Sequence, residues 1–337
     1  MSRDELVPLA PEEGVERFLD YREPSVRKNT LQNARTRLKH FLEWCEEYDV
    51  ENLNDLSGRD LAAFVSWRQP DIAPVTLQKQ LSTIRQALRW WADIEAVEQG
   101  LAEKVHAPEV PDGSTSKDVH LDAERARMIL GYLDRYHYAS RQHAIFALLW
   151  RTGMRLSAIH SLDVDDLVED EHAVVVEHRP EEGTMLKNGS DGDRWIYVGP
   201  EWFQIVKEYA EMHRPDATDD HGREPLFPSE RSERLAKGSI YKIVNRWTQP
   251  CRYGGCPHGR DESECIALEN GKESKCPSSR SPHAIRRGAI THHLNEDVPP
   301  EVASERMNVS LEVLYEHYDV RTEQEKMETR KDRLPKE

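Results

Sequence analysis

The sequence predicts a mainly α-helical protein with a small β-sheet (α+β), divided into an N-terminal four-helix domain and a larger C-terminal domain. Three observations support this fold class: helical spacing of apolar residues through 1–106, a Pro-, Gly- and Ser-rich segment at 107–117, and two short β-like runs among helices in 118–337. A chain of 337 residues is long enough for two or three domains. We therefore expect a linker at 107–117 between domains 1–106 and 118–337.

The first domain is expected to be all-helical. Apolar residues recur at helical spacing over 31–48 and again over 77–91, with polar residues between them. Ser57 and Asp60 have the spacing of a capping box, which places the start of another helix there. Basic residues lie on the polar faces of the long helices, and by themselves they are ordinary solvated surface: Arg35, Arg37, Lys79, Arg85 and Arg89.

The second domain mixes helices with one hairpin. Residues 141–151 are apolar nearly all round, which predicts a buried helix that ends at Thr152-Gly153. The segments 173–176 and 195–198 predict two strands, joined as a hairpin by the polar, Gly-rich stretch 181–193. Further helices are expected at 122–136, 202–213, 240–247 and 311–318, followed by a charged, helical segment at 320–337 that packs on a neighbouring protomer or is a solvated tail.

Charge and hydropathy exclude some classes of protein. No stretch approaches the roughly 18 apolar residues that a membrane span needs, and the N-terminus lacks a secretory apolar segment, so we expect a cytoplasmic protein without a membrane partner. The chain has 62 acidic and 46 basic residues, which give a net charge of −16, and most of the basic residues are arginines. Such a surface suits concentrated salt, which suggests a halophilic archaeal source. Because salt weakens phosphate binding, local arginine placement matters more than net charge, and DNA is not excluded.

Separated segments of the second domain carry residues suited to phosphate chemistry. They comprise a Thr-Gly-Met-Arg turn after the buried helix, a lysine in the hairpin, a His-Ala-Ile-Arg segment with both basic residues on one side of a helix, and two tyrosines near the C-terminus. Each segment alone is weak evidence for such chemistry. An arginine after such a turn more often forms a surface ion pair, and a lone tyrosine usually packs in the core or at its edge. The residues are Arg155, Lys187, His283, Arg286, Tyr315 and Tyr318.

Taken together and in this order, the segments resemble the tyrosine recombinase (phage-integrase-like) family over essentially the whole chain. Thr152-Gly153-Met154-Arg155 matches the family's first box, and His283-Ala284-Ile285-Arg286, followed by Thr291-His292-His293-Leu294, matches its second. Lys187 corresponds to the family's hairpin lysine and Tyr318 to its nucleophile. The resemblance implies a SAM-like core-DNA-binding domain over residues 1–106 and a tyrosine-recombinase catalytic domain over 118–337.

The chain departs from the family's pattern at two positions. Ala158 stands where the family commonly has Glu, three residues after the first Arg. The family usually has His or Trp about nine residues before the nucleophile, whereas the nearest candidate here is Asn308, ten residues before Tyr318. We favour Tyr318 as the nucleophile because a helix over 311–318 would place it at the helix end, and Tyr315 stays the alternative.

The resemblance implies an enzyme that cuts and rejoins DNA in integration, excision or resolution, with no metal or cofactor for catalysis. Arg155 and Arg286 would stabilise negative charge on the phosphate, because each guanidinium presents a fork of donors. Tyr318 would attack to form a 3′-phosphotyrosyl link. His283 would accept the phenol proton, and Lys187 would protonate the departing 5′-oxygen.

The resemblance also implies partners. We expect double-stranded DNA and self-association into a tetrameric synapse on two duplexes. The departures at Ala158 and Asn308 leave an alternative, namely a catalytically inactive relative that acts as a DNA-binding regulator or accessory protein, and an α-rich zinc protein of unrelated function is a third reading. If the chain binds DNA, phosphate contacts are expected from some of Arg35, Arg37, Lys79, Arg85 and Arg89.

Four of the five cysteines lie in a Cys-rich insertion at 251–276, directly before His283. Without a secretion signal, disulfides are the less favoured explanation. Four thiolates suit a structural zinc, with His258 as an alternative ligand, although the spacings differ from those of common zinc ribbons. Zinc is favoured, and free or redox-active thiols and disulfides stay open. The expected ligands are Cys251, Cys256, Cys265 and Cys276, while Cys45 is expected in a helical core.

Overall fold

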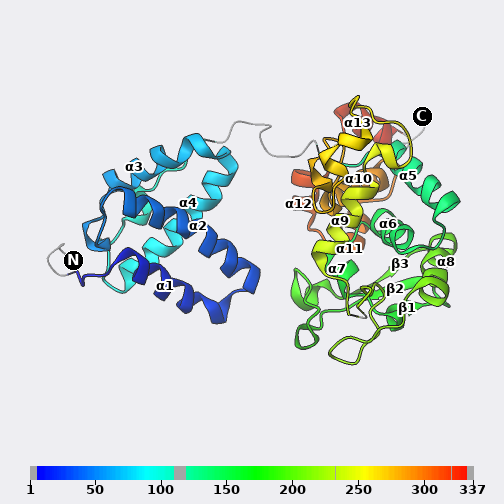
Figure 1. The fold of residues 1–337 in the computed structure, drawn as a ribbon, viewed down its shortest axis with the longest axis horizontal. Helices are drawn as coiled ribbons and strands as arrows, with labels where there is room; N and C mark the ends of the chain where they lie inside the picture. Colours follow the sequence, from blue (N-terminus) through cyan, green and yellow to red (C-terminus); the bar gives the residue numbers. More distant parts are fainter. Residues whose placement is uncertain (1–5, 110–118, 232, 320, 332–337) are drawn as a thin grey trace. The chain divides into compact units, whose positions relative to one another are not determined.

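The structure, a computed structural model, describes residues 6–109, 119–231, 233–319 and 321–331. The chain divides into two compact units, Met1–Ser116 and Lys117–Glu337 (Figure 1). Each unit has its own hydrophobic core. This division falls at the end of the expected linker 107–117, whose residues from 110 onward lie outside the described part of the chain. The predicted fold class is confirmed: the described residues are mainly helical, with one small antiparallel sheet.

The described residues of the first unit form helices α1 (Pro11–Arg22), α2 (Lys28–Glu47), α3 (Gly58–Arg68) and α4 (Pro74–Asp93). The long helices each bury one face, as their apolar spacing predicts, and Cys45 of α2 lies in the core as expected. The capping box at the start of α3 is confirmed, because the backbone N–H of Ser57 donates to Asp60 Oδ2 at 2.8 Å. Aromatic rings from α2, α3 and α4 fill the space between the helices.

The second unit is arranged around α6 (Arg141–Thr152), which is buried on nearly all sides as its sequence predicts. Helices α5 (Ala123–Tyr136), α8 (Pro200–Glu208), α9 (Lys237–Trp247) and α10 (Pro282–Asn295) pack against it. The remaining helices are α7 (Leu156–Ser161), α11 (Pro300–Met307), α12 (Leu311–Val313) and α13 (Glu323–Lys331). Within the described ranges, no helix combines the length and the apolar character that crossing a bilayer requires.

The sheet lies at one side of this unit, next to α8 in Figure 1. Strands β1 (Leu167–Val168), β2 (Ala173–Val176) and β3 (Arg194–Tyr197) are antiparallel in the order β1-β2-β3, with Val174 opposite Ile196. The hairpin of β2 and β3 is the predicted one. The sequence did not reveal β1, because two residues are too few to show an alternating pattern.

The C-terminal helices form a small core of their own around Ile290, Leu294, Ala303, Met307, Leu314 and Tyr318. The helix predicted over 311–318 is present as α12 followed by a wider π-type turn, Leu314–Tyr318. Ser310 caps its start, as expected, by accepting a hydrogen bond from the backbone N–H of Val313. This arrangement carries Tyr318 back against α10, where its backbone carbonyl accepts a hydrogen bond from Thr291 at 3.0 Å.

Candidate active site

Arg155 is placed by a tight turn between α6 and α7. Gly153 ends α6 with φ +58°, a left-handed conformation that glycine adopts without strain. A side chain there would also be obstructed, since an added Cβ would lie 2.8 Å from Met307 Sδ. Two residues later, Arg155 is the N-cap residue of α7. The turn therefore packs closely on Met307 of α11 at Gly153, two residues before Arg155.

Asn308 holds the side chain of Arg155. Arg155 Nη1 donates to the backbone oxygen of Asn308 at 2.6 Å and to its Oδ1 at 3.0 Å. The same amide group accepts a hydrogen bond from Asn188, and its Nδ2 donates to the backbone oxygen of Asp191 at 2.6 Å. Asn308, the residue nearest to the position where the family usually has His or Trp, thus links Arg155 to the loop between β2 and β3.

Arg286 approaches from α10 and is fully enclosed, with 1% of its surface exposed. Its Nη1 donates to the backbone oxygens of Gly153 at 2.6 Å and Met307 at 2.8 Å. Its Nε and Nη2 atoms have no hydrogen-bond partner among the described residues. Because a buried donor without a partner costs free energy, these two groups are suited to binding an acceptor from outside the chain.

Tyr318 lies directly beside Arg286 and His283. The Arg286 Cζ atom is 5.1 Å from the centroid of the Tyr318 ring, and the His283 ring meets the Tyr318 ring edge-on at a centroid distance of 5.4 Å. Tyr318 is 6% exposed, whereas Tyr315 is 52% exposed. Of the two candidate tyrosines, Tyr318 is the one that the structure brings to the arginine and the histidine.

Positive charge is concentrated around this tyrosine. Burial, together with the positive charge of Arg155, lowers the pKa of Arg286 to about 10. Burial likewise lowers the pKa of Arg194 and of Arg306 to about 10. Arg194, which begins β3 and donates to the backbone oxygen of Arg306 at 3.1 Å, is a member of the site that the sequence analysis missed. A single arginine at a strand end gives no signal in the sequence.

The same charges act on His283. Partial burial lowers the pKa of His283 to about 4, together with the positive charges of Arg287, Arg286, Lys187 and Arg155. One face of this side chain nevertheless stays exposed to solvent. His283 is therefore neutral at neutral pH, so one of its ring nitrogens carries no proton.

Lys187 lies in the loop between β2 and β3, with its side chain exposed. It lines a small pocket together with Arg155, Arg194 and Asn308. The structure therefore gathers Arg155, His283, Arg286 and Tyr318, and places Lys187 at their edge. Ala158, at the position where the family commonly has Glu, is a buried residue of α7 that also lines this pocket.

The basic residues of the first unit differ in their surroundings. Arg35 and Lys79 are exposed, and Arg37 donates to Thr83 Oγ1 at 3.1 Å. Two others contact the segment after α4: Arg85 donates twice to the backbone oxygen of Val105, and Arg89 pairs with Glu103 at 3.3 Å. Their role in DNA binding stays a prediction.

The Cys-rich insertion, residues 251–276, is built from short turns tied to α9. Gln249, which is buried, donates to the backbone oxygens of Ala267 at 2.7 Å and Glu273 at 3.2 Å. In the structure, none of these four cysteines is joined in a disulfide. Across the described ranges, no three or more His, Cys, Asp or Glu side chains are gathered as a metal site requires. The zinc hypothesis stays a prediction.

Two family models match this chain. The phage integrase family model matches residues 120–319, which is more than half of the chain, and the model of the phage integrase N-terminal SAM-like domain matches residues 15–93. Among curated proteins, tyrosine recombinase XerD of Mycobacterium tuberculosis is 26% identical over 166 residues, covering 49% of this chain and 43% of XerD. Tyrosine recombinase XerC of Vibrio cholerae is 20% identical over 203 residues, covering 59% of this chain and 54% of XerC. The chain thus spans about half of these relatives or less.

Solved integrase structures share the fold. The Tn1549 transposon integrase in complex with a circular intermediate DNA has a TM-score of 0.69 at 14% identity, covering 97% of this chain and 100% of that one. The lambda integrase tetramer bound to a Holliday junction has a TM-score of 0.64 at 14% identity, covering 91% and 76%. With both domain models matched in order along the sequence, the chain belongs to the phage integrase family, the tyrosine recombinases.

Proposed function

We propose that this protein is a site-specific recombinase that cuts and rejoins double-stranded DNA through a 3′-phosphotyrosyl intermediate. The observation that carries the proposal is the contact between Tyr318 and Arg286, in which the phenol ring lies 5.1 Å from a buried guanidinium with two unpaired nitrogen atoms. A phosphodiester bound to those donors would have its phosphorus beside the tyrosine. This arrangement favours covalent cleavage over passive DNA binding.

The reaction would divide among five side chains. Tyr318 Oη attacks the phosphorus, and the bond between phosphorus and the 5′-oxygen breaks. His283 takes the phenol proton, while Lys187 gives a proton to the departing 5′-oxygen. Arg155 and Arg286 bind the non-bridging oxygens, whose negative charge grows in the five-coordinate transition state. The phosphotyrosine keeps the bond energy, so a 5′-hydroxyl can reverse the step without ATP.

The structural neighbours support the proposed partners. The Tn1549 integrase is bound to DNA, and the lambda integrase is bound to a Holliday junction as a tetramer. We extend both properties to this chain, which would bind double-stranded DNA and assemble as a tetramer on it. In the first unit, exposed Arg35 and Lys79 are the strongest candidates for phosphate contact, followed by Arg37.

The test needs a DNA site, which selection can supply. The Tyr318→Phe variant is used to retain duplexes from a random pool, and the enriched sequences are rebuilt as duplexes nicked close to the scissile phosphate. Cleavage of such a duplex releases a short fragment, so the covalent complex cannot reseal. We expect the native protein to form an adduct with DNA that survives denaturation.

The two tyrosine variants separate the possible outcomes. Tyr318→Phe should abolish the adduct and keep DNA affinity, while Tyr315→Phe should form it at close to the native rate. Loss of the adduct only in Tyr315→Phe would reassign the nucleophile. Selective DNA binding by the native protein without any adduct would instead favour the inactive relative that acts as a regulator or accessory protein.

The structural zinc is a separate proposal, with Cys251, Cys256, Cys265 and Cys276 as ligands. Zinc would brace the insertion that leads into α10 and would take no part in catalysis. Metal analysis of the purified protein should find about one zinc per chain. Cys251→Ser should lose the zinc, and Cys45→Ser, whose thiol lies in the other unit, should keep it. A native protein purified without zinc contradicts this proposal.

A further inference from the structure

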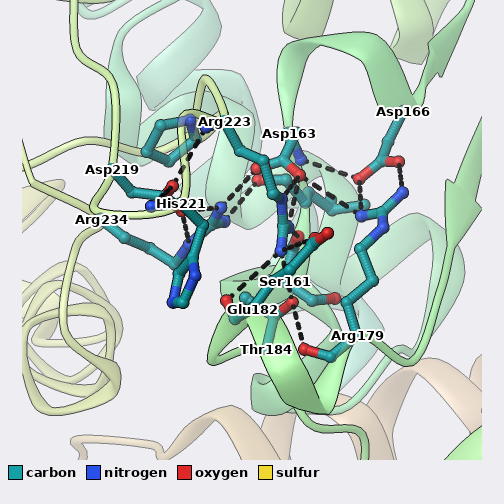
Figure 2. Close-up of polar contacts among 12 residues, drawn as sticks. Ser161, Asp163, Asp166, Arg179, Glu182, Thr184, Asp219, His221, Arg223 and Arg234 are labelled. Carbon is teal, nitrogen blue, oxygen red and sulfur yellow. Dashed lines mark hydrogen bonds and ion pairs between the residues drawn. The ribbon is translucent and has the colours of Figure 1, made fainter.

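A network of buried ion pairs lies at the base of the loop that carries Lys187. Three arginines, Arg179, Arg223 and Arg234, surround the carboxylate of Asp163, and Arg179 also binds Asp166 (Figure 2). The side chains of Asp163 and Asp166 are 8% and 5% exposed. A network this enclosed is a costly feature, because each charge loses its hydration on burial.

Arg179 closes a turn within the loop, just before Lys187. Its backbone pairs with that of Thr184 in both directions, at 3.2 and 3.0 Å, so residues 180–183 form a closed turn. Its guanidinium binds both oxygens of Asp166, at 2.6 and 3.1 Å, and reaches Asp163 at 3.3 Å. Lys187 follows Thr184 by three residues. The start of the loop is therefore fixed to the segment after α7.

Arg223 makes the second connection. Its Nη1 donates to Thr184 Oγ1 at 2.9 Å and to Glu182 Oε2 at 3.0 Å, both in the loop. Its Nε donates to Asp163 Oδ2 at 2.7 Å, and its Nη2 donates to the backbone oxygen of Ser161 at 3.3 Å. One guanidinium thus joins the loop to the C-terminal end of α7. The N-terminal end of that helix carries Arg155.

The other side of the loop is attached as well, since Asn188 and Asp191 both bond to Asn308, which holds Arg155. Lys187 is therefore an exposed side chain on a loop attached on either side of it. A proton donor needs such placement, because a misplacement of about 1 Å can reduce a rate by about 100-fold. A buried charge network that is costly for stability is well suited to specify a geometry.

We infer that Asp163, Arg179 and Arg223 are positioning residues, which hold the turn 179–184 just before Lys187 so that Lys187 delivers its proton to the departing 5′-oxygen. This inference rests on the proposed function. In the step concerned, the bond between phosphorus and the 5′-oxygen breaks, and that oxygen gains the proton that Lys187 loses. The three residues act only through Lys187.

Arg234 provides a matched control. It binds the same Asp163 carboxylate at 2.5 Å and also Asp219 at 2.8 Å. Its other described hydrogen bonds go to the backbone oxygens of His160 and Leu162, and none reaches the loop. Arg234→Lys therefore disturbs the network to an extent similar to Arg223→Lys, but leaves the contacts to the loop in place.

The experiment compares two nicked duplexes that differ in one atom, the 5′-bridging oxygen or a 5′-bridging sulfur. A thiolate leaves without protonation, so a variant that lacks only proton delivery recovers on the sulfur substrate. Lys187→Ala and Arg223→Lys should each form the adduct at least about tenfold more slowly on oxygen. On sulfur, both should come within about twofold of the native rate. Arg234→Lys should resemble the native protein on both substrates.

Each other result has a distinct meaning. Equal slowing of Arg223→Lys on the oxygen and sulfur substrates overturns the inference. So does an Arg234→Lys variant that is slow on oxygen and recovers on sulfur, as Arg223→Lys is expected to do. A native protein without any adduct, or Lys187→Ala without recovery on sulfur, contradicts the proposed function instead.

Hydrogen exchange of residues 180–192 tests, without a measurement of catalysis, whether the ion-pair network holds the loop in place. Exchange should be faster in Arg223→Lys than in Arg234→Lys, and equal exchange overturns the inference. Thr184→Val, which removes only the hydroxyl that Arg223 contacts, replaces Arg223→Lys if that variant fails to fold.

Discussion

At the scale of single residues, Arg286 shows most clearly how function conflicts with folding. Its guanidinium is buried, burial lowers its pKa to about 10, and two of its nitrogen atoms have no partner in the described part of the chain. Each unpaired buried donor costs about 1–3 kcal/mol. The non-bridging oxygens of a phosphodiester would satisfy both donors and neutralise the charge, so we expect Arg286 to contribute most when DNA is bound.

Arg286→Lys should separate charge from geometry. Lysine keeps the positive charge but cannot present two parallel donors, so the transition state should lose support while long-range attraction to DNA persists. We expect adduct formation to slow by about 100-fold or more, with DNA affinity changed by less than about threefold. Single-turnover adduct formation and a binding titration measure the two effects. A variant that cleaves at nearly the native rate would remove Arg286 from the mechanism.

His293 predicts how stability depends on pH. It is buried in α10 with Nδ1 at 2.7 Å from the backbone oxygen of Ala289, and burial lowers its pKa from 6.5 to about 4. Between these values the unfolded chain binds more protons than the folded one, so stability rises with pH across this window. From pH 7 to pH 5 this residue should reduce the free energy of unfolding by about 2 kcal/mol.

His293→Gln should remove that contribution. Denaturant unfolding at pH 7 and pH 5 should show a smaller difference between the two pH values in the variant than in the native protein. Identical pH dependence in the two proteins would mean that His293 titrates normally in the folded state.

At the scale of elements, α10 is held by a close approach of two backbones. A Cβ added at Gly288 would lie 1.8 Å from the backbone oxygen of Leu121, just before α5, and the backbone N–H of Leu121 donates to the oxygen of Ala284 at 3.1 Å. This contact places the helix that carries His283 and Arg286. The position therefore accepts only glycine.

Gly288→Ala should destabilise the protein by several kcal/mol, because one of the two backbones must move. Gly131→Ala is the matched control: Gly131 lies within α5, and no atom comes within 4 Å of an added Cβ. The control should gain about 0.5–1 kcal/mol, since alanine favours helix. Thermal unfolding measures both changes, and a neutral Gly288→Ala would contradict the close approach.

The elements also show how far the sequence predicts this structure. Apolar spacing located α2, α4 and α6, and local chemistry located the capping box at Ser57 and the turn at Gly153, because these signals lie within a few residues of one another. The approach of Arg286 to Tyr318 depends on packing between distant segments. The sequence could suggest it only through the order of the family's boxes, and it gave no sign of Arg194.

At the scale of the whole molecule, the two units have separate hydrophobic cores. Each core is large enough for its unit to fold without the other. The acidic net charge of −16 coexists with a strongly positive site because the arginines of that site are concentrated locally in the second unit.

Fragments 1–109 and 119–337 should therefore fold independently. Circular dichroism should show a helical spectrum for each, and each should unfold cooperatively. The temperatures of these transitions should match two separate steps in the whole protein. A fragment that stays unfolded alone would mean that its core requires the other unit.

The unpaired nitrogen atoms of Arg286 have a consequence for directed evolution. A selection that rewards only heat resistance would favour an uncharged side chain that still donates to the oxygens of Gly153 and Met307 but leaves no donor unpaired, because the DNA-free protein then holds no unsatisfied buried cation. The selected variants would be more thermostable but catalytically inactive. Laboratory improvement of such an enzyme would have to score strand joining in every round.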